Sequence, residues 1–381
     1  MKIAHVCPFY APAICGVKQV VQELSERYVK EGHEVHVFTS DWDKEERIDK
    51  KEEILNGVHI HRCFHWFRVV NFINFWPSVF WKLWEQDFDV VHTHLSFHPH
   101  SFLAALICKL KKIPHVHTTH CPWTEENRNF LGKIIKSISK FTYVKWLYQM
   151  SDKIIAITPW EIQFIKEFGG DEKKIITLPN GMDNLFFKKT ERKFFKREFG
   201  IDKKVILFFA RYNKTKSPQN FVLMAKEILK KRKDIAFVMI GPDEGEYKNT
   251  KNLVKGEKDI YVLGPVRGKE KIAEMYQSSE IYVLPSFREG LPLTLFEAMA
   301  SGLPIVATSV NGIPYEMENN VNGFLVEWND IIGLAKSVIK ILENRSLSQK
   351  FKKNNIQKAK KYSWDIITKK TLNLYASLLK K

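Results

Sequence analysis

The amino-acid sequence predicts an α/β protein with two doubly wound domains, each built on a parallel sheet. Three observations support this fold class. The chain has 381 residues, which suggests two domains of roughly 150–200 residues each. Short, continuous apolar runs alternate with helical patterns, as is typical of parallel strands covered on both faces. The same alternation begins again after Gly200.

The first half begins with a predicted strand at residues 2–7, a loop at residues 8–16 and a helix that ends at Gly32. A strand at residues 34–39 completes a strand–loop–helix–strand unit. Gly16 stands at the helix start, where backbone N–H groups can bind phosphate. Further strands are expected at residues 58–62, 90–92, 115–118 and 154–157.

The second half repeats this pattern. Strands are expected at residues 205–210, 236–240, 260–263, 281–284, 304–308 and 323–326, and helices at residues 220–231, 269–278 and 293–301. The Lys-rich residues 188–203 predict a linker, preceded by a turn at Pro179, Asn180 and Gly181. Two such sheets are expected to bind a ligand at the carboxyl ends of their strands.

The composition, 44% hydrophobic and 27% charged, is typical of a soluble globular protein. No apolar run reaches the roughly 18–20 residues of a membrane-spanning helix, and the N-terminal residues lack a signal-peptide pattern. The five cysteines form no CxxC pair, which indicates reduced cytosolic thiols. We therefore expect a cytoplasmic protein, with peripheral attachment to the inner face of the cell membrane as the alternative.

The net charge of +17 is concentrated in residues 336–381, which contain 13 Lys and Arg residues and only two acidic residues, Glu343 and Asp365. Apolar residues alternate with these lysines, so the tail is expected to form amphipathic helices. Attraction to anionic lipid, to nucleic acid or to anionic substrates would follow from such a charge. A Lys-rich composition without a function is the alternative.

A loop and helix start after the strand at residues 281–284 indicate a specific chemistry. Pro292 suits the first turn of a helix, and the free amides around Leu293 would form a site for a diphosphate. Glu289 lies just before this helix start, and Glu297 follows eight positions later. One carboxylate could meet a sugar and the other a ribose. The alternative is a capping glutamate and a solvent-facing one.

The run PSFREGLPLTLFEAMASGLPIVAT resembles the signature of the family-4 retaining glycosyltransferases, also called glycosyl transferases group 1. In that signature Glu-x7-Glu is followed by Ala-Met-Ala-x-Gly-x-Pro. The stretches FYAPAICGVKQVVQEL, HTTH, LPNGMD and FFARYNKTKSP resemble other family elements, so the likeness covers nearly the whole chain. It implies the GT-B fold: Rossmann-like domains at residues 1–187 and 188–362 face a cleft, and a final helix at residues 363–381 returns to the first domain.

The resemblance implies roles for matching residues in the second domain. Glu289 would contact the transferred sugar, and Glu297 the nucleotide ribose. The backbone of four residues would hold phosphate and sugar, namely Gly290, Leu291, Pro292 and Leu293. Arg211 and Lys216 would neutralise the diphosphate leaving group without a metal ion. As isolated residues they would be ordinary surface cations.

In the first domain the resemblance implies that Gly16 approaches the donor phosphate and that His120 lies near the donor sugar. A core histidine is the alternative for His120. Cys15 stands where family members have a second glycine, and Ser217 replaces the glycine that usually follows the lysine, which is expected to matter little. All 13 histidines lie in residues 1–120, but no HExxH or Cys–His spacing supports a zinc site, so no metal is expected.

Two segments bear on the acceptor. Residues 64–84 contain nine aromatic side chains, and residues 131–150 combine lysines with apolar residues. Exposed at a surface, the aromatic residues could lie at a lipid interface or stack on sugars, whereas buried helix packing is the alternative. With the basic tail, they favour a lipid-linked or membrane-surface acceptor.

The predicted activity is therefore transfer of a sugar, expected to be a hexose, from a UDP-, GDP- or ADP-linked donor to the hydroxyl of a glycan or glycolipid. Retention of anomeric configuration follows from the resemblance, in which the leaving phosphate helps to deprotonate the acceptor. No cofactor beyond the nucleotide sugar and no nucleic-acid partner are expected. The alternatives are a sugar-nucleotide epimerase or phosphorylase on the same fold, and a non-catalytic protein that binds membranes or nucleic acid.

Overall fold

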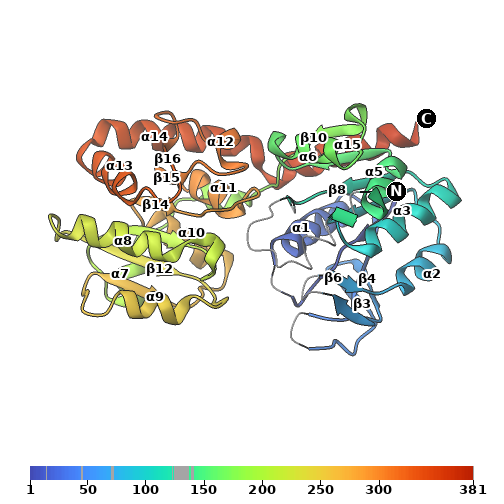
Figure 1. The fold of residues 1–381 in the computed structure, drawn as a ribbon, viewed down its shortest axis with the longest axis horizontal. Helices are drawn as coiled ribbons and strands as arrows, with labels where there is room; N and C mark the ends of the chain where they lie inside the picture. The colour runs from blue at the N-terminus through green and yellow to red at the C-terminus, as the bar shows by residue number, and fades with distance from the viewer. Residues whose placement is uncertain are drawn as a thin grey trace. The chain divides into compact units, whose positions relative to one another are not determined.

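The computed structural model describes residues 1–13, 15–43, 46–69, 73–121, 123, 137–138 and 141–380. The chain forms two compact units, Met1–Asn180 together with Trp364–Lys381, and Gly181–Ser363. Each unit has a central, mainly parallel sheet flanked by helices (Figure 1). The predicted fold class is confirmed.

The first unit contains an eight-stranded sheet in the order β10-β9-β8-β7-β1-β2-β4-β3. Its strands are β1 Lys2–Val6, β2 Glu34–Ser40, β3 Glu52–Leu55, β4 Val58–Cys63, β7 Val90–His94, β8 His115–Thr118, β9 Lys153–Ala156 and β10 Ile175–Thr177. All neighbours are parallel except β3 and β4. The sequence did not predict the edge strands β3 and β10, because one is half charged and the other has only three residues.

The helices of the first unit are α1 Gly16–Lys30, α2 Ser78–Trp84, α3 Pro99–Lys111, α5 Tyr143–Met150, α6 Ile162–Glu167 and α15 Trp364–Leu379. A two-stranded sheet of β5 Phe67–Val69 and β6 Ile73–Phe75 precedes α2. Helices α2 and α3 pack against each other and contribute to a core with β1 and β7. None of the helices in the described part of the chain has the length and apolar character needed to cross a membrane.

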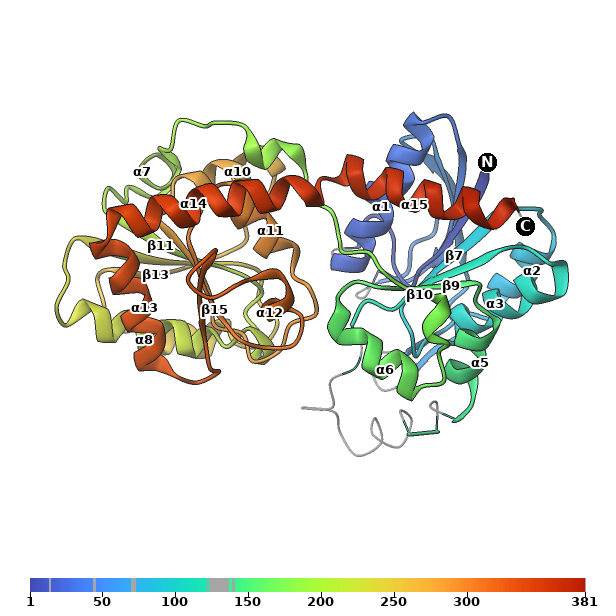
Figure 2. The ribbon, with the colours of Figure 1, turned by 90° about the horizontal axis from the view of Figure 1, so that it is seen from above.

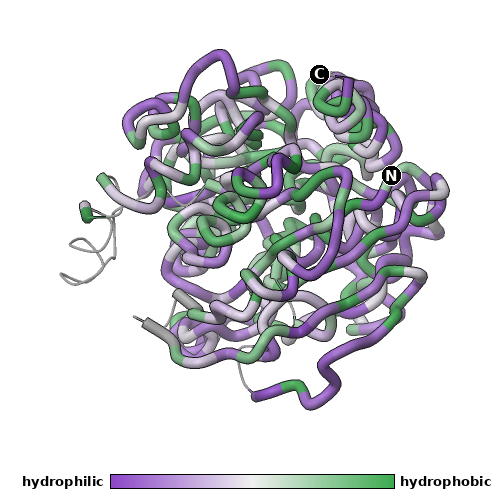
Figure 3. Tube along the Cα trace, turned by 90° about the vertical axis from the view of Figure 1, so that its right-hand side faces the viewer, coloured by the Kyte–Doolittle hydropathy of each residue, from purple (hydrophilic) through white to green (hydrophobic). Residues whose placement is uncertain are grey.

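The C-terminal helix α15 belongs to the first unit, as the resemblance implied. It packs along α1 (Figure 2), and it carries both hydrophobic and hydrophilic residues near the C label in Figure 3. Its buried residues recur at helical spacing: Trp364, Ile367, Thr368, Thr371, Tyr375 and Leu378. The Tyr375 ring lies 5.9 Å from that of Tyr28 on α1, and its hydroxyl is 2.6 Å from Nδ1 of His92 on β7.

The second unit has a six-stranded, fully parallel sheet in the order β13-β12-β11-β14-β15-β16. Its strands are β11 Lys204–Phe209, β12 Ile235–Ile240, β13 Ile260–Leu263, β14 Ile281–Leu284, β15 Ile305–Thr308 and β16 Gly323–Val326. Most of their residues are buried on both faces, as the continuous apolar runs predicted. The predicted strands of this unit differ from these by one residue at most.

The helices of this unit are α7 Phe194–Phe199, α8 Pro218–Leu229, α9 Tyr247–Leu253, α10 Lys269–Gln277, α11 Leu293–Ala300, α12 Ile313–Glu316, α13 Ile331–Glu343 and α14 Arg345–Ala359. Helix α8 packs against α13, and α11 packs against α10 and α14. The basic tail thus forms the amphipathic helices α13, α14 and α15, each with one buried face.

The prediction of a linker at residues 188–203 is wrong. This segment contains α7, whose Phe194 and Phe195 are buried in the second unit. Arg197 donates two hydrogen bonds of 2.8 and 2.7 Å to the Glu274 carboxylate on α10. The Lys-rich composition suggested a linker because charged residues flank Phe194 and Phe195 on both sides.

Candidate functional site

The candidate donor site lies in the second unit, where the strand order reverses. The sheet proceeds in one direction from β11 to β13 and in the other from β14 to β16. The loops that follow β11 and β14 therefore leave the same edge of the sheet side by side, which is where open α/β sheets bind ligands. A hydrogen bond of 3.1 Å from the Phe287 N–H to the Thr215 carbonyl joins these two loops.

A close approach of two backbones positions the loop after β11. A Cβ atom at Gly241, which follows β12, would lie 1.8 Å from the carbonyl oxygen of Ala210, so only glycine fits there. The chain then turns so that Arg211 extends from the sheet edge with half of its side chain exposed. Its Nη1 donates to both carboxylate oxygens of Glu244 at 2.9 Å, and Asn213 donates to the same carboxylate.

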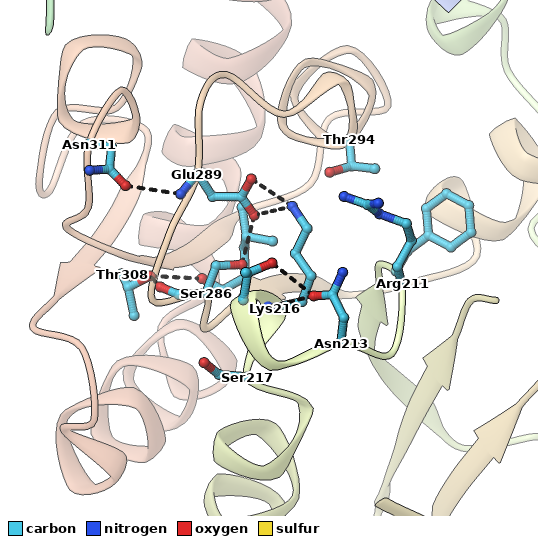
Figure 4. A network of polar contacts seen from close by, with 12 residues as sticks. Arg211, Asn213, Lys216, Ser217, Ser286, Glu289, Thr294, Thr308 and Asn311 are labelled. Carbon is cyan, nitrogen blue, oxygen red and sulfur yellow. Dashed lines mark hydrogen bonds and ion pairs between the residues drawn. The ribbon is translucent and has the colours of Figure 1, made fainter. Parts of the chain in front are cut away.

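The centre of the site is an ion pair between the two loops. The Lys216 ammonium lies 2.6 Å from both carboxylate oxygens of Glu289 (Figure 4). Only 13% of the lysine side chain and 4% of the glutamate side chain are exposed. Ser286 donates a further hydrogen bond of 2.7 Å to Glu289 Oε1. Because a buried charge is stable only when it is paired and hydrogen-bonded, each partner fixes the position of the other.

Further hydrogen bonds hold the Glu289 loop. The Glu289 N–H donates to the Asn311 side-chain oxygen at 3.1 Å, and the Thr308 hydroxyl donates to the Ser286 carbonyl. In Figure 4 the Arg211 guanidinium points toward the Lys216 ammonium and toward Thr294 on α11. The two cations and the first turn of α11 thus face one region at the sheet edge.

The start of α11 has the features of an anion site. Pro292 precedes its first residue, and among the described residues no side chain caps this N-terminus. The amides of the first turn keep a partial positive charge, which favours anions. The loop that leads into this turn contains Gly290 and the buried Leu291.

Glu297 is on α11, one turn after this start, and does not join the Lys216–Glu289 pair. Its Oε2 accepts a hydrogen bond of 3.1 Å from the buried Tyr276 hydroxyl. Burial raises the pKa of this tyrosine, and the neighbouring carboxylate adds to the effect. Tyr276 therefore remains a neutral donor that orients Glu297.

Two local features differ from the family pattern in the way that the sequence indicated. Cys15 caps α1, because its Sγ accepts a hydrogen bond of 3.4 Å from the Lys18 N–H. A Cβ at Gly16 would meet no heavy atom of the described chain within 4 Å, so packing in that part of the chain does not require glycine there. Ser217 has φ 47°, the left-handed conformation that glycine adopts more readily.

His120 lies in the loop after β8, and a buried carboxylate holds this loop. Glu161 accepts four hydrogen bonds, from the Thr119 hydroxyl at 2.7 Å, the Cys121 N–H at 2.5 Å, the Trp123 indole at 2.9 Å and the Ile157 N–H at 2.6 Å. Burial raises the pKa of Glu161, and these hydrogen bonds oppose that change. They stabilise His120 and Cys121 at φ 57° and 54°, which non-glycine residues rarely adopt.

We expect Glu161→Ala to lower the free energy of unfolding of the first unit by about 3 kcal/mol or more, because four donors, three of them buried, would lose this acceptor. Glu167→Ala, an exposed position on the neighbouring helix, is the control and should change stability by less than about 0.5 kcal/mol. Urea denaturation followed by circular dichroism measures both. Equal, small effects of the two substitutions would show that the four hydrogen bonds contribute little.

Among the described residues, one group of side chains has the arrangement of a possible metal site, namely His5, His92 and His94. Both ring nitrogens of His92 are already in hydrogen bonds, Nδ1 with the Tyr375 hydroxyl at 2.6 Å and Nε2 with the Thr118 hydroxyl at 2.7 Å. A metal ion would have to break one of these bonds, so this group does not fit a metal well. The absence of a metal requirement stays a prediction.

Sequence reasoning identified the charged residues of the site but not the groups that hold them. It missed five supporting residues: Asn213, Glu244, Ser286, Asn311 and Glu161. Ser286 precedes Glu289 by three residues and Asn311 begins the loop after β15, so their places near the signature are a usable signal. Nothing in the sequence distinguishes Glu161 from an ordinary first-turn glutamate.

Comparisons with known proteins identify the class of this chain. Residues 14–184 match the family model described as Glycosyltransferase Family 4, and residues 189–358 match the model described as Glycosyl transferases group 1. The protein is therefore a glycosyltransferase. It belongs to the family 4, group 1 glycosyltransferases, the family that the signature at residues 285–304 resembles.

Two relatives and one solved structure illustrate the match. The UDP-Gal:alpha-D-GlcNAc-diphosphoundecaprenol alpha-1,3-galactosyltransferase of Escherichia coli is 25% identical, over 91% of this chain and 89% of that protein. The alpha-monoglucosyldiacylglycerol synthase of Acholeplasma laidlawii is 26% identical, over 100% of this chain and 98% of that protein. The structure of Anabaena HepE in complex with UDP-glucose has a TM-score of 0.78 at 16% identity and covers 99% of this chain and 100% of that chain. The expected GT-B architecture is thereby confirmed.

Proposed function

We propose that the protein transfers a hexose from a nucleotide sugar to an acceptor hydroxyl with retention of anomeric configuration. One observation carries the proposal: the buried Lys216–Glu289 pair lies beside the uncapped start of α11, with Arg211 directed to the same region. This combination of two cations, helix amides and an oriented carboxylate suits a diphosphate with a sugar attached.

In the proposed reaction, Arg211 and Lys216 stabilise the diphosphate as the glycosidic bond breaks and negative charge develops on the leaving oxygen. Glu289 accepts hydrogen bonds from the hydroxyls of the sugar. The backbone from Gly290 to Leu293 holds the phosphate and the sugar, and Glu297 accepts from the ribose. The leaving phosphate takes the proton of the acceptor hydroxyl on the same face, which gives retention. No metal ion takes part.

The first unit is proposed to contribute two groups to the same reaction. Gly16, at the start of α1, lets the donor phosphate approach the backbone, and the open space around its Cα supports this role. His120 hydrogen-bonds the sugar or the acceptor oxygen at the reacting carbon.

UDP is the proposed nucleotide, with GDP and ADP as alternatives. The Escherichia coli relative is named for UDP-Gal, and the HepE structure contains UDP-glucose. The identity of the hexose depends on the hydroxyl groups that face Glu289 and its loop.

A lipid-linked acceptor is the proposed second substrate. Five aromatic side chains around β5 and α2 are exposed: Phe64, Trp66, Phe67, Trp81 and Trp84. Trp76 is buried against the His100 ring, so packing accounts for only part of this segment. Exposed aromatic clusters favour a lipid interface, and both relatives are named for acceptors or products with a lipid part. Phe72 and residues 131–136 and 139–140 of the basic segment lie outside the described residues.

A thermal-shift comparison of UDP, GDP and ADP, each with and without an attached hexose, tests the donor. At a concentration of about 100 times the dissociation constant, the bound nucleotide should add about 2.7 kcal/mol of stability. Incubation of the stabilising nucleotide sugar with a lipid extract should then release the nucleoside diphosphate and give a lipid product with the donor's anomeric configuration. An inverted product would contradict retention. Conversion of the donor without an acceptor would instead support an epimerase or phosphorylase.

Arg211→Ala is expected to raise the KM for the donor and to lower kcat, with a combined loss in kcat/KM of about 100-fold, because one of two cations on the leaving group is removed. Arg232→Ala removes an arginine from an ion pair with Asp234 in the same unit and should leave both constants unchanged. Steady-state kinetics with the purified variants makes the comparison. If Arg211→Ala retained wild-type kcat/KM, the proposed role would be wrong.

A further inference from the structure

Three histidines form a hydrogen-bonded chain at the carboxyl ends of the strands of the first sheet. His5 is on β1, His94 ends β7, and His120 follows β8. His5 Nδ1 lies 2.9 Å from His94 Nε2, and His94 Nδ1 lies 3.0 Å from His120 Nε2. The strand order of this sheet reverses between β1 and β7, so the chain begins at the topological switch point.

The ring of His94 therefore uses both nitrogens to connect its two neighbours. Burial lowers the pKa of His5 to about 3 and holds that of His94 well below its usual range. Burial of the ring also lowers the pKa of His120 to about 3, although the residue as a whole is partly exposed. At neutral pH each ring is thus uncharged and has one N–H donor and one acceptor nitrogen.

Two hydrogen bonds in series restrict the proton positions. If His94 donates from Nδ1, it must accept at Nε2, and all three rings carry their proton on Nδ1. If His94 donates from Nε2, all three protons are on Nε2. Any other combination of neutral tautomers loses at least one of the two hydrogen bonds. The tautomer of His120 is therefore coupled to that of His5, two rings away.

The far end of the chain decides between these two arrangements. His5 Nε2 is fully buried and has no hydrogen-bond partner among the described residues. A proton on this nitrogen would be a buried donor without an acceptor, which folded proteins tolerate less well than an unused acceptor. The first arrangement avoids that donor, because His5 then keeps its proton on Nδ1.

We infer that His5 and His94 are positioning residues that fix His120 as the Nδ1–H tautomer, so that His120 offers a hydrogen-bond donor to a sugar or acceptor oxygen. The assignment of this oxygen rests on the proposed function, whereas the tautomer rests on the first unit alone. The Nδ1–H of His120 would donate a hydrogen bond to that oxygen, and this nitrogen could not accept a proton from it.

Glu161 and the histidine chain act on different parts of His120. The hydrogen bonds to Glu161 hold the Thr119 hydroxyl and the Cys121 N–H, on either side of this residue, whereas His94 contacts its ring. A substitution at His94 therefore leaves the loop held by Glu161 and changes the constraint on the ring. This separation makes the inference testable.

The experiment uses the full chain with ¹⁵N-labelled histidine and compares wild type, His94→Phe, His94→Asn and His115→Asn. Protonated and bare ring nitrogens have well-separated ¹⁵N shifts, so long-range ¹H–¹⁵N spectra report the tautomer of His120. We expect Nδ1–H in wild type and in His94→Asn, whose amide can still donate to His120 Nε2. His94→Phe should give a mixture of tautomers. His115 is equally buried but bonded to Thr93 and Ser151, so His115→Asn should leave His120 unchanged.

Transfer kinetics provide the second measurement. His94→Phe should lower kcat about tenfold, equivalent to about 1.4 kcal/mol, with little change in the donor KM. His94→Asn should restore most of this loss. An Nε2–H tautomer at His120 in wild type would overturn the inference, as would Zn²⁺ binding that removes the Nδ1–H signals of His5 and His94. An unchanged kcat in His94→Phe with a mixed tautomer would also overturn it.

The two measurements separate this inference from the proposed function. If no sugar is transferred from any nucleotide sugar, the proposed function fails. The tautomer of His120 in wild type still decides whether His5 and His94 position this ring. If His94→Phe does not fold, the wild-type spectrum and the His94→Asn variant decide it.

Discussion

Glu289→Gln is expected to lower sugar transfer by about 100- to 1,000-fold, and Glu289→Ala to abolish it, while the protein remains folded. The carboxylate of Glu289 holds the Lys216 ammonium through both oxygens and accepts from Ser286. Glutamine keeps the shape of this side chain but removes its charge and one acceptor. The variant therefore loses the orientation of Lys216 as well as the direct contact of the carboxylate with the sugar.

Glu316→Gln is the matched control for this prediction. Glu316 is also buried in the second unit, beside Lys358 and the Tyr362 hydroxyl, but it is not part of the β11 and β14 loops. Both substitutions leave a lysine without its carboxylate, so both are expected to lower the midpoint of denaturation. Only Glu289→Gln should lower kcat/KM. Wild-type transfer by the Glu289 variants would contradict the assigned role.

The first unit is expected to unfold in mild acid, at a pH where the second unit is still folded. Burial lowers the pKa of His5 and His115 to about 3 and that of His98 to about 4. Four more buried histidines have a pKa well below the usual value: His92, His94, His100 and His117. The unfolded chain binds protons below about pH 6.5 that the folded unit excludes, so the free energy of unfolding decreases as the pH falls.

The expected loss of stability follows from the difference between the histidine pKa values in the folded and unfolded states. Between about pH 7.5 and about pH 5.5, each histidine that stays neutral in the fold lowers the stability by about 1.4 kcal/mol. Several such residues together match the total stability of a typical domain, roughly 5–15 kcal/mol. The loss should begin near the unfolded pKa of about 6.5 and continue toward the folded values.

The second unit is a built-in control, because all 13 histidines lie in residues 1–120. Scanning calorimetry over this pH range should show one transition that moves to lower temperature and one that stays nearly constant. Tryptophan fluorescence should follow the first of these, since Trp328 is the only tryptophan between Gly181 and Ser363. A single transition with a constant midpoint would contradict the prediction.

The sequence predicted the parts of the fold in which pattern and burial coincide. Continuous apolar runs marked β11 to β16 because these strands are covered on both faces. The same reasoning failed at β3, an edge strand with two glutamates, and at α7, where buried phenylalanines are surrounded by lysines. In these places tertiary packing, which composition does not reveal, determines the structure.

The candidate site was predicted as a set of residue types but not as a set of contacts. Arg211, Lys216 and Glu289 were predicted from the resemblance to the family together with their positions after strands, yet the pairing of Lys216 with Glu289 joins residues 73 positions apart. The histidine cluster was visible in the sequence. Its hydrogen bonds depend on the register of β1 and β7, in which His5 lies opposite His92 and next to His94. Such registers are set by the complete sheet.

The return of α15 to the first unit also has a consequence for synthesis on the ribosome. The second unit is continuous in sequence, from Gly181 to Ser363, so all of its residues are translated before α15. The first unit is interrupted, because the contact of Tyr28 with Tyr375 requires residues that follow the whole second unit. The half that is translated first is therefore completed only after the second unit has been made, and until then the face of α1 that packs against α15 stays uncovered.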